Sequence, residues 1–222
     1  MTVKVAINGF GRIGRCFARA LYTHHGHDIE LVAVNDLTAP ETLKHLFEFD
    51  SVMGRLGSKV TLDGDVMSVN GHQVKFLAEA DPSKLPWGEL GVDIVIECTG
   101  IFTTGPKAKA HLDAGAKKVL VSAPSKGADV TLAYGVNTEA YTPDATIISN
   151  ASCTTNALAP LAKVLDDLAG TQQHRRGLAD GAAHDVDGVV HAVGEVHVHA
   201  TGRPEHGGIA RRPPVEGVCA RV

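Results

Sequence analysis

The sequence is poor in aromatic residues and has no block of charge of one sign. Aromatic residues make up 5% of the 222 residues, with one tryptophan, and the formal net charge is -4 at pH 7. Because acidic and basic residues are interspersed, no basic stripe predicts a nucleic-acid partner and no charged block predicts a membrane surface. An apolar fraction of 44% is still sufficient for a hydrophobic core.

Long apolar runs, a leader pattern and paired cysteines are also missing. No segment is apolar enough to span a bilayer, and the N-terminus enters a strand-like pattern without a basic region or a cleavage site. These absences predict a cytoplasmic protein with no membrane partner. The cysteines have no CxxC spacing and cytosolic thiols are normally reduced, so we expect no disulfide among Cys16, Cys98, Cys153 and Cys219.

The last part of the chain lacks residue types that the rest has. Thr171–Val222 contains no Lys, Ser, Asn, Met, Phe, Tyr or Trp, but six of the twelve histidines and six of the ten arginines. If Arg and Leu are set aside, residues whose codons begin with A or T number 63 in the first 170 positions and four in the last 52. This contrast indicates a GC-rich message read in a shifted frame. The alternative is a genuine tail biased towards Gly, Ala and Arg.

The histidines of this tail alternate in one place. His197 and His199, with His191 upstream, would project from one face of a strand and could bind a metal. An accidental run of histidines explains the same pattern and is the favoured interpretation. We therefore expect no metal site.

What is present before the tail is an alternation of short apolar runs and amphipathic segments, which is typical of an α/β fold with a mostly parallel sheet. The expected strands are Val3–Ile7, Ile29–Val34, Ile94–Cys98, Val119–Val121 and Thr146–Ser149. The expected helices are Arg12–His24, Thr42–Phe47, Pro106–Ala114 and Cys153–Leu168. Between Lys59 and Leu77, Asp63-Gly64 and Asn70-Gly71 interrupt β-prone runs, which predicts inserted antiparallel hairpins.

A glycine pattern lies between the first strand and the first helix. In Gly-x-Gly-x-x-Gly, Gly9 would allow a tight turn, Gly11 would let the backbone approach a pyrophosphate, and Gly14 would let the helix pack on the strand. The helix N-terminus would then face the anion. Turn glycines alone could give the same pattern, so the signal depends on its strand and helix context.

An acidic residue follows the second strand. Asp36 lies within reach of an adenosine ribose, where it would accept hydrogen bonds from both hydroxyls and repel a 2′-phosphate. This favours NAD over NADP. The alternative is that Asp36 caps a helix over Thr38–Phe47.

A cysteine begins the last expected helix. The N-terminus of a helix favours thiolate over thiol, and Leu158, Leu161, Leu165 and Leu168 on one face predict that this helix is packed and its start held in place. Beside a nicotinamide, the Cys153 thiolate could attack an aldehyde and retain the acyl group as a thioester. The alternative is a small buried cysteine whose Ser and Thr neighbours only cap the helix.

Five segments together closely resemble the phosphorylating glyceraldehyde-3-phosphate dehydrogenases. They are Asn8–Arg15, Asn35-Asp36, Leu85–Trp87, Thr99–Phe102 and Ala151–Asn156. The likeness covers residues 1 to about 170 and implies a Rossmann-type NAD-binding domain at 1–150, followed by the first helix of a catalytic domain at 151–170. It also implies glyceraldehyde 3-phosphate and inorganic phosphate as partners, NAD as cofactor, and a homotetramer.

The same resemblance assigns roles to single residues. Cys153 takes the position of the nucleophile, and Ser152 and Thr154 are expected to contact substrate or inorganic phosphate. The residues expected to hold NAD are Asn8, Gly9, Phe10, Gly11, Arg12, Ile13, Gly14, Asn35, Asp36, Thr99, Gly100 and Ser122. Ala80 departs from the family, which commonly has a basic residue near the adenine there, so NAD affinity is expected to be somewhat reduced.

The resemblance ends near Thr171. The family's activating histidine, its phosphate-anchoring residues and its subunit contacts have no match in 171–222; His174 and His184 lie at about the right distance but in different surroundings. We therefore expect residues 171–222 to be an aberrant tail of disordered composition, catalysis to be impaired by truncation, and tetramer assembly to be disfavoured. The alternative is an inactive NAD-binding fragment. A triose phosphate and an erythrose phosphate substrate are not distinguished.

Overall fold

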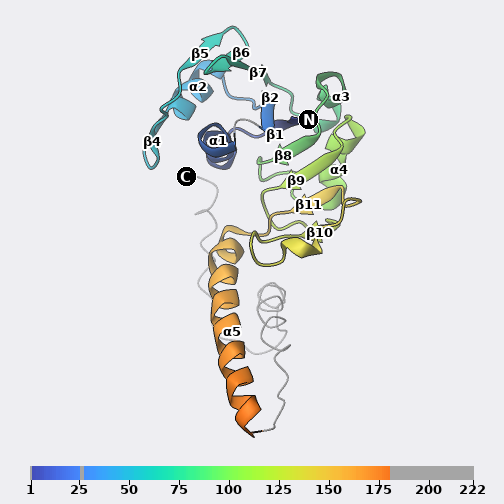
Figure 1. The fold of residues 1–222 in the computed structure, drawn as a ribbon. Helices are drawn as coiled ribbons and strands as arrows, with labels where there is room; N and C mark the ends of the chain where they lie inside the picture. The colour runs from blue at the N-terminus through green and yellow to red at the C-terminus, as the bar shows by residue number, and fades with distance from the viewer. Residues whose placement is uncertain (1, 26–27, 181–222) are drawn as a thin grey trace, which may run out of the picture. The chain divides into compact units, whose positions relative to one another are not determined.

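The computed structural model describes residues 2–25 and 28–180, and it divides into two compact units, Met1–Thr155 and Asn156–Val222 (Figure 1). Among the described residues, nine strands of the first unit form one sheet in the order β10-β11-β9-β8-β1-β2-β7-β6-β5. The strands are β1 (Val3–Asn8), β2 (Ile29–Asn35), β5 (Val60–Asp63), β6 (Val66–Val69), β7 (His72–Leu77), β8 (Ile94–Glu97), β9 (Lys118–Val121), β10 (Val130–Thr131) and β11 (Ile147–Ser149).

Helices connect these strands along the chain, and one helix follows the last strand. They are α1 (Arg12–Ala20), continued by the π-helical turn η1 (Leu21–His25), α2 (Pro40–Glu48), α3 (Trp87–Leu90), α4 (Gly105–Asp113) and α5 (Cys153–Asp180), with 3-10 turns η2 (Pro82–Lys84) and η3 (Thr138–Ala140). A separate two-stranded hairpin joins β3 (Phe49–Asp50) to β4 (Gly54–Arg55).

The centre of the sheet is parallel, because β1 pairs in parallel with both β2 and β8. Successive side chains of a strand point to opposite faces. Val5 and Ile7 accordingly join a core cluster with Phe10 and Phe47, whereas Ala6 joins a second cluster around Trp87. Burial on both faces explains why three successive residues of β1, Val5, Ala6 and Ile7, are all apolar. The mostly parallel α/β fold predicted from the sequence is confirmed.

The inserted hairpins form an antiparallel meander of β5, β6 and β7. Its turns use left-handed backbone at Gly64 (φ 59°), Asn70 (φ 51°) and Gly71 (φ 92°), which Asn and Gly tolerate better than other residues. The predicted hairpins are therefore present. Their last strand, β7, then pairs in parallel with β2, so that the meander extends the main sheet.

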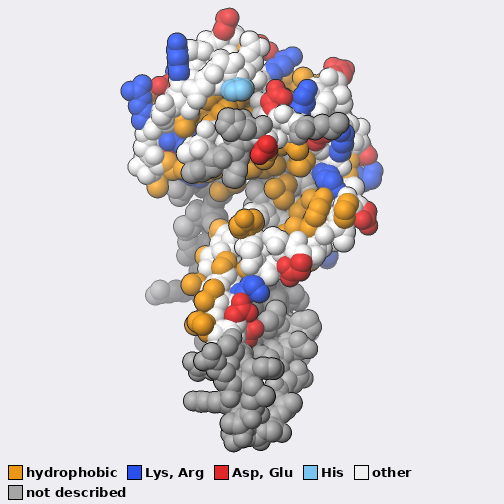
Figure 2. Space-filling model, viewed as in Figure 1, with side chains coloured by type: hydrophobic (Ala, Val, Ile, Leu, Met, Phe, Trp, Pro, Cys, Tyr) orange, Lys and Arg blue, Asp and Glu red, His pale blue; other side chains and the backbone are white. Residues whose placement is uncertain are grey.

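The last helix differs from the expectation. α5 continues to Asp180, beyond the predicted end at Leu168, and contains Pro160 in its interior. The apolar stripe on this helix is exposed: Leu158 59%, Leu161 64%, Leu165 67% and Leu168 59%. Figure 2 shows hydrophobic side chains along the surface of the described helix. The expectation of a packed face was wrong, because periodicity identifies an apolar face without identifying an element to cover it.

The other expectations for the tail fall on residues that the structure does not describe. His184, His191, His197 and His199 lie outside the described ranges, as does Cys219. Of the helices within 2–25 and 28–180, none is both long and apolar enough to cross a membrane.

Candidate functional site

The predicted cofactor residues follow the carboxyl ends of four neighbouring parallel strands. The glycine loop follows β1, Asp36 follows β2, Thr99 follows β8 and Ser122 follows β9. In the sheet β1 lies between β2 and β8, so the chain crosses to one side after β1 and to the other side later. The crevice at such a reversal is where open α/β sheets bind ligands.

The glycine loop has the geometry that its sequence predicts at two positions. Gly9 has φ +91°, and a Cβ there would lie 2.7 Å from the Thr99 nitrogen. A Cβ on Gly14 would lie 2.2 Å from the carbonyl oxygen of Gly9, so α1 can pack on the loop only without a side chain. A Cβ on Gly11, by contrast, would meet no described atom within 4 Å. The loop is thus tight on its inner side and open at Gly11, which fits the approach of a pyrophosphate.

Asp36 joins the end of β2 to the glycine loop. Its Oδ2 accepts a hydrogen bond from the backbone N–H of Phe10 at 2.8 Å, and its Oδ1 accepts one from the N–H of Thr38 at 2.9 Å. The residue preceding α2 is Ala39, which makes no side-chain cap. The alternative interpretation, that Asp36 caps this helix, is therefore wrong. A carboxylate has about four acceptor positions, so two bonds leave capacity for ribose hydroxyls.

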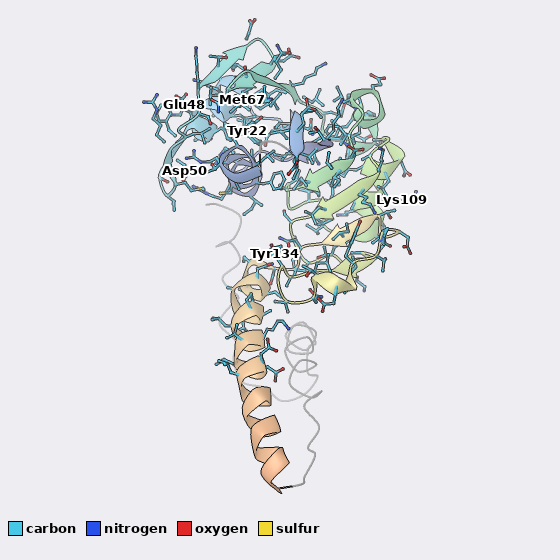
Figure 3. All side chains as sticks on the ribbon, viewed as in Figure 1. Tyr22, Glu48, Asp50, Met67, Lys109 and Tyr134 are labelled. Carbon is cyan, nitrogen blue, oxygen red and sulfur yellow. The ribbon has the colours of Figure 1, made fainter. Side chains whose placement is uncertain are left out.

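The Arg12 side chain is held by an ion pair at the start of α1. Its Nη1 lies 2.6 Å from Oδ2 of Asp50, which Figure 3 labels beside α1. Asp50 Oδ1 also accepts hydrogen bonds from the backbone N–H groups of Val52 and Met53. The Met53 and Val52 N–H groups and the Arg12 guanidinium hold the pKa of Asp50 well below its usual range. The backbone N–H groups at the start of α1 are a further set of donors that an NAD pyrophosphate could use.

Three exposed apolar side chains border these residues in the sequence. Ile13 is 52% exposed, Leu37 69% and Ile101 62%. They come from the start of α1, the segment after β2 and the turn after β8. Apolar walls around a few placed polar groups are typical of cofactor sites, and adenine and nicotinamide rings would cover such surface.

Two predicted cofactor residues have their side chains inside the protein. Asn8 is 2% exposed and Asn35 is 5% exposed, and the Asn35 Nδ2 donates to Oδ1 of Asn8 at 2.7 Å. The same buried group contains Glu97 and His111, at 1% and 0% exposure, which the sequence reading missed. A carboxylate closing the apolar run of β8 was the signal that could have identified Glu97.

The Ser152 hydroxyl organises the start of α5. Its Oγ accepts a hydrogen bond from the Thr155 N–H at 2.9 Å and lies 2.8 Å from the Thr154 hydroxyl oxygen. This is the geometry of an N-cap, so Cys153 is the first helical residue. Ala151, before the cap, has φ 54° and is 7% exposed. The chain thus turns sharply between β11 and α5.

The thiols differ in their access to solvent. Cys153 is exposed, whereas burial raises the pKa of Cys98 to about 12. Ser122 donates its backbone N–H to the Glu97 carbonyl at 3.0 Å, beside Cys98. An exposed thiol can meet a substrate, and a buried thiol with a raised pKa is a poor nucleophile. Of these two, Cys153 is suited to covalent chemistry.

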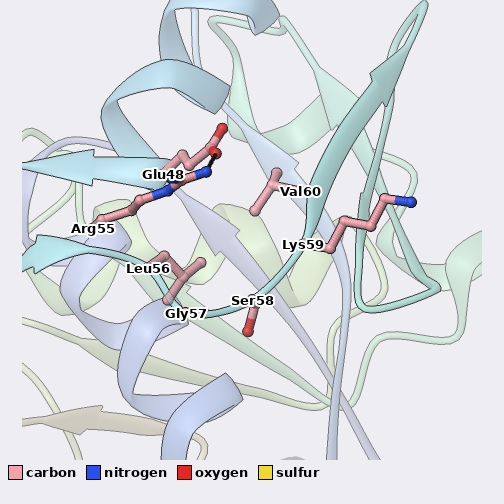
Figure 4. A pocket seen from close by; sticks show the side chains of 7 residues that line it. All are labelled: Glu48, Arg55, Leu56, Gly57, Ser58, Lys59 and Val60. Carbon is pink, nitrogen blue, oxygen red and sulfur yellow. Dashed lines mark hydrogen bonds and ion pairs between the residues drawn. The ribbon is translucent and has the colours of Figure 1, made fainter.

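A hollow of about 400 Å³ lies elsewhere on the first unit. Figure 4 shows its lining: Glu48, Arg55, Leu56, Gly57, Ser58, Lys59 and Val60. The Glu48 carboxylate is paired with Lys44 at 2.8 Å and with Arg55 at 3.4 Å. None of the lining residues was predicted as a site residue. In the described part of the chain, no three His, Cys, Asp or Glu side chains are grouped so that they could hold a metal.

Comparison with known proteins supports the cofactor site. Residues 3–105 match the family model for the glyceraldehyde 3-phosphate dehydrogenase NAD binding domain. A glyceraldehyde-3-phosphate dehydrogenase of Kitasatospora aureofaciens is 64% identical over 170 residues, 76% of this chain and 51% of the relative. One from Xanthobacter flavus is 57% identical over 173 residues, 78% of this chain and 52% of the relative. The chain spans about half the length of these curated relatives.

Proposed function

We propose that this chain binds NAD and carries the nucleophile of a phosphorylating aldehyde oxidation, because residues 3–105 match the model for the NAD binding domain of glyceraldehyde 3-phosphate dehydrogenase. The proposed substrates are glyceraldehyde 3-phosphate and inorganic phosphate. The observation that supports this best is the joint presence of the glycine loop with Asp36 and of an exposed Cys153 at a helix start.

The cofactor would be held by the edge of the sheet. The open backbone at Gly11 and the start of α1 suit the pyrophosphate, and the remaining acceptor positions of Asp36 suit the ribose. Ile13, Leu37 and Ile101 supply apolar surface for the rings. When bound, NAD supplies a hydride acceptor.

Cys153 would supply the covalent step. Its sulfur would attack the aldehyde carbon, and after oxidation it would hold the acyl group as a thioester until inorganic phosphate displaced it. Ser152 and Thr154 offer hydroxyl groups beside that position, joined to each other at 2.8 Å. These hydroxyls are proposed to bind substrate or phosphate.

A second candidate is NAD binding without turnover. It is favoured by one observation: 171–222 contains no match to the histidine that activates the thiol in the family. General-base assistance is typically worth about two to four powers of ten in rate. We therefore expect the isolated chain to bind NAD more readily than it turns over substrate.

The test uses the purified 222-residue chain and two cysteine variants. NADH formation from glyceraldehyde 3-phosphate, NAD and phosphate should be slow, should require phosphate, and should disappear in Cys153→Ser while persisting in Cys16→Ser. NAD-dependent thermal stabilisation without NADH formation would support the binding candidate instead. The absence of both signals would contradict both candidates.

A further inference from the structure

Behind the glycine loop lies a group of buried polar side chains contributed by separate segments. Asn8 ends β1, Asn35 ends β2, Glu97 ends β8 and His111 lies in α4; none is more than 5% exposed. Buried polar and charged groups are costly unless hydrogen bonds satisfy them. The hydrogen bonds among these four side chains therefore determine which neighbouring backbone segments they fix.

The sole tryptophan fixes the direction of the bonds. The Trp87 Nε1–H can only donate, and it lies 3.0 Å from His111 Nδ1, so Nδ1 is the acceptor. The His111 proton is therefore assigned to Nε2, which donates to Glu97 Oε2 at 2.9 Å. The Asn8 Nδ2 donates to the same oxygen at 2.7 Å. The 3.4 Å approach of Asn8 Nδ2 to His111 Nε2 is then a contact between two donors that share one acceptor.

The second carboxylate oxygen holds the turn that follows β8. Glu97 Oε1 accepts hydrogen bonds from the Thr99 N–H, at 2.7 Å, and from the Thr99 hydroxyl. The Thr99 Oγ1 in turn accepts from the Ile101 N–H at 3.1 Å. The carboxylate is thus fully surrounded by donors, and two of them belong to a turn predicted to contact NAD.

This turn is also in direct contact with the glycine loop. A Cβ on Gly9 would lie 2.7 Å from the Thr99 nitrogen, so the two backbones touch. The Phe102 ring, just beyond the turn, meets the His111 ring edge-on with centroids 6.4 Å apart. A change at His111 can therefore reach Thr99 through Glu97 and through Phe102.

We propose that His111 is a positioning residue for the cofactor site, acting through Glu97 to fix the Thr99–Ile101 turn against the glycine loop. The proposal rests on the proposed function in so far as NAD is the molecule that this edge of the sheet receives. His111 itself is fully buried, so its side chain is not available to a ligand at the surface. Trp87, bonded to its other nitrogen, is expected to report the state of the site.

The test compares His111→Leu with His111→Gln in the full chain. Leucine cannot donate to Glu97 or accept from Trp87, whereas the glutamine amide can do both. In the absence of NAD, amide hydrogen exchange at Thr99, taken relative to Val95 in the same segment, should become about tenfold faster in His111→Leu. It should stay near the wild-type ratio in His111→Gln. An unchanged ratio in His111→Leu would overturn the proposal.

NAD affinity measured by calorimetry gives a second readout. His111→Leu should weaken NAD binding by about tenfold, because an unfixed turn must be ordered on binding. The control is Val69→Ala, which removes fully buried side-chain volume from β6 and destabilises the fold without touching the turn. An equal loss of NAD affinity in both variants would mean that His111 acts only through stability, and would contradict the proposal.

The unmodified protein provides a test that does not depend on folding of His111→Leu. The indole N–H resonance of Trp87 should shift on addition of NAD with the midpoint found by calorimetry, and an unmoved resonance at saturation would contradict the proposal. If the wild-type chain binds no NAD, the proposed function fails. The ratio of amide exchange at Thr99 to that at Val95, measured without NAD, still tests whether the buried network fixes the turn. Trp87→Phe, which removes only the indole N–H bond to His111, is a milder variant for this measurement.

Discussion

Asp36 and Asp50 are carboxylates of one small region with different partners. Asp36 accepts from the backbone of the glycine loop and retains acceptor capacity, whereas Asp50 binds two backbone N–H groups and the Arg12 guanidinium. The first is therefore suited to a ligand, and the second to fixing the β3–β4 hairpin against α1. Their charge alone would not have separated these roles.

Asp50 should make stability depend on pH. Its pKa is lowered in the folded state, so its stabilisation is complete above the ordinary Asp pKa of about 3.9 and is lost progressively as the pH falls below it. The urea midpoint of Asp50→Asn should be well below that of the wild type at pH 7, and the difference should shrink towards pH 2. Asp113→Asn, whose side chain is 59% exposed, is the control. A difference that grew on acidification would contradict the assignment.

The thiols should react selectively. At neutral pH iodoacetate should label Cys153 and leave Cys98 unmodified, because burial raises the pKa of Cys98 to about 12 and Cys153 is exposed. Peptide mass mapping after a short exposure measures this, and Cys153→Ser should remove the early label. Labelling of Cys98 as fast as that of Cys153 would contradict the protection of Cys98 by burial.

Some residues could be assigned from sequence and others could not. Gly9 and Gly14 have steric roles that a local pattern determines, and the geometry matches them. The roles of Glu97 and His111 depend on contacts between β8 and α4, separated by 14 positions, and no local pattern specifies that contact. The assignment of residues to NAD and to substrate remains a prediction.

The turn between β11 and α5 contains a residue in a strained backbone conformation. Ala151 has φ 54°, a left-handed conformation that costs an L-residue with a Cβ about 1 kcal/mol or more. Because Ala151 directly precedes the Ser152 cap, its backbone conformation sets the direction in which α5 begins. Such strain is common where a side chain must be presented at a set angle.

Replacing Ala151 by glycine tests this strain. Glycine relieves the left-handed conformation but increases the entropy of the unfolded chain, so Ala151→Gly should change the unfolding free energy by less than about 1 kcal/mol, in the stabilising direction. Ala145→Gly, at a site of similar burial without positive φ, should destabilise by about 0.5–1 kcal/mol. Urea denaturation of both variants measures the contrast, and equal destabilisation would contradict it.

At the level of elements, the sequence predicted the strands that appear as short apolar runs. The five expected strands and the Asn70-Gly71 hairpin were found, and no end of the five strands is shifted by more than one residue. β3, β4, β10 and α3 were missed; each of the three strands has only two residues, too few to form a pattern, and α3 is a single turn of helix. The parallel pairing of β7 with β2 was also missed, since it depends on the whole sheet.

For the whole molecule, the first unit carries all twelve residues predicted to hold NAD. They lie at the carboxyl edge of one sheet, and the matched family domain covers residues 3–105. The leucine stripe of α5 is a feature whose packing could not be predicted from the sequence. Its apolar spacing was read correctly, yet the face is exposed in the described structure, because what covers a helix is a property of the assembled molecule.

We propose that this sheet edge binds NAD and that Asp36 makes the site select NAD over NADP. Calorimetric titration of the full chain with each dinucleotide tests the claim most directly, with Asp36→Asn and the surface control Asp113→Asn alongside. We predict that NAD binds at least about tenfold more tightly than NADP, that Asp36→Asn narrows this preference, and that Asp113→Asn leaves it unchanged. No binding of NAD, or equal affinity for NAD and NADP in the wild type, would contradict the account.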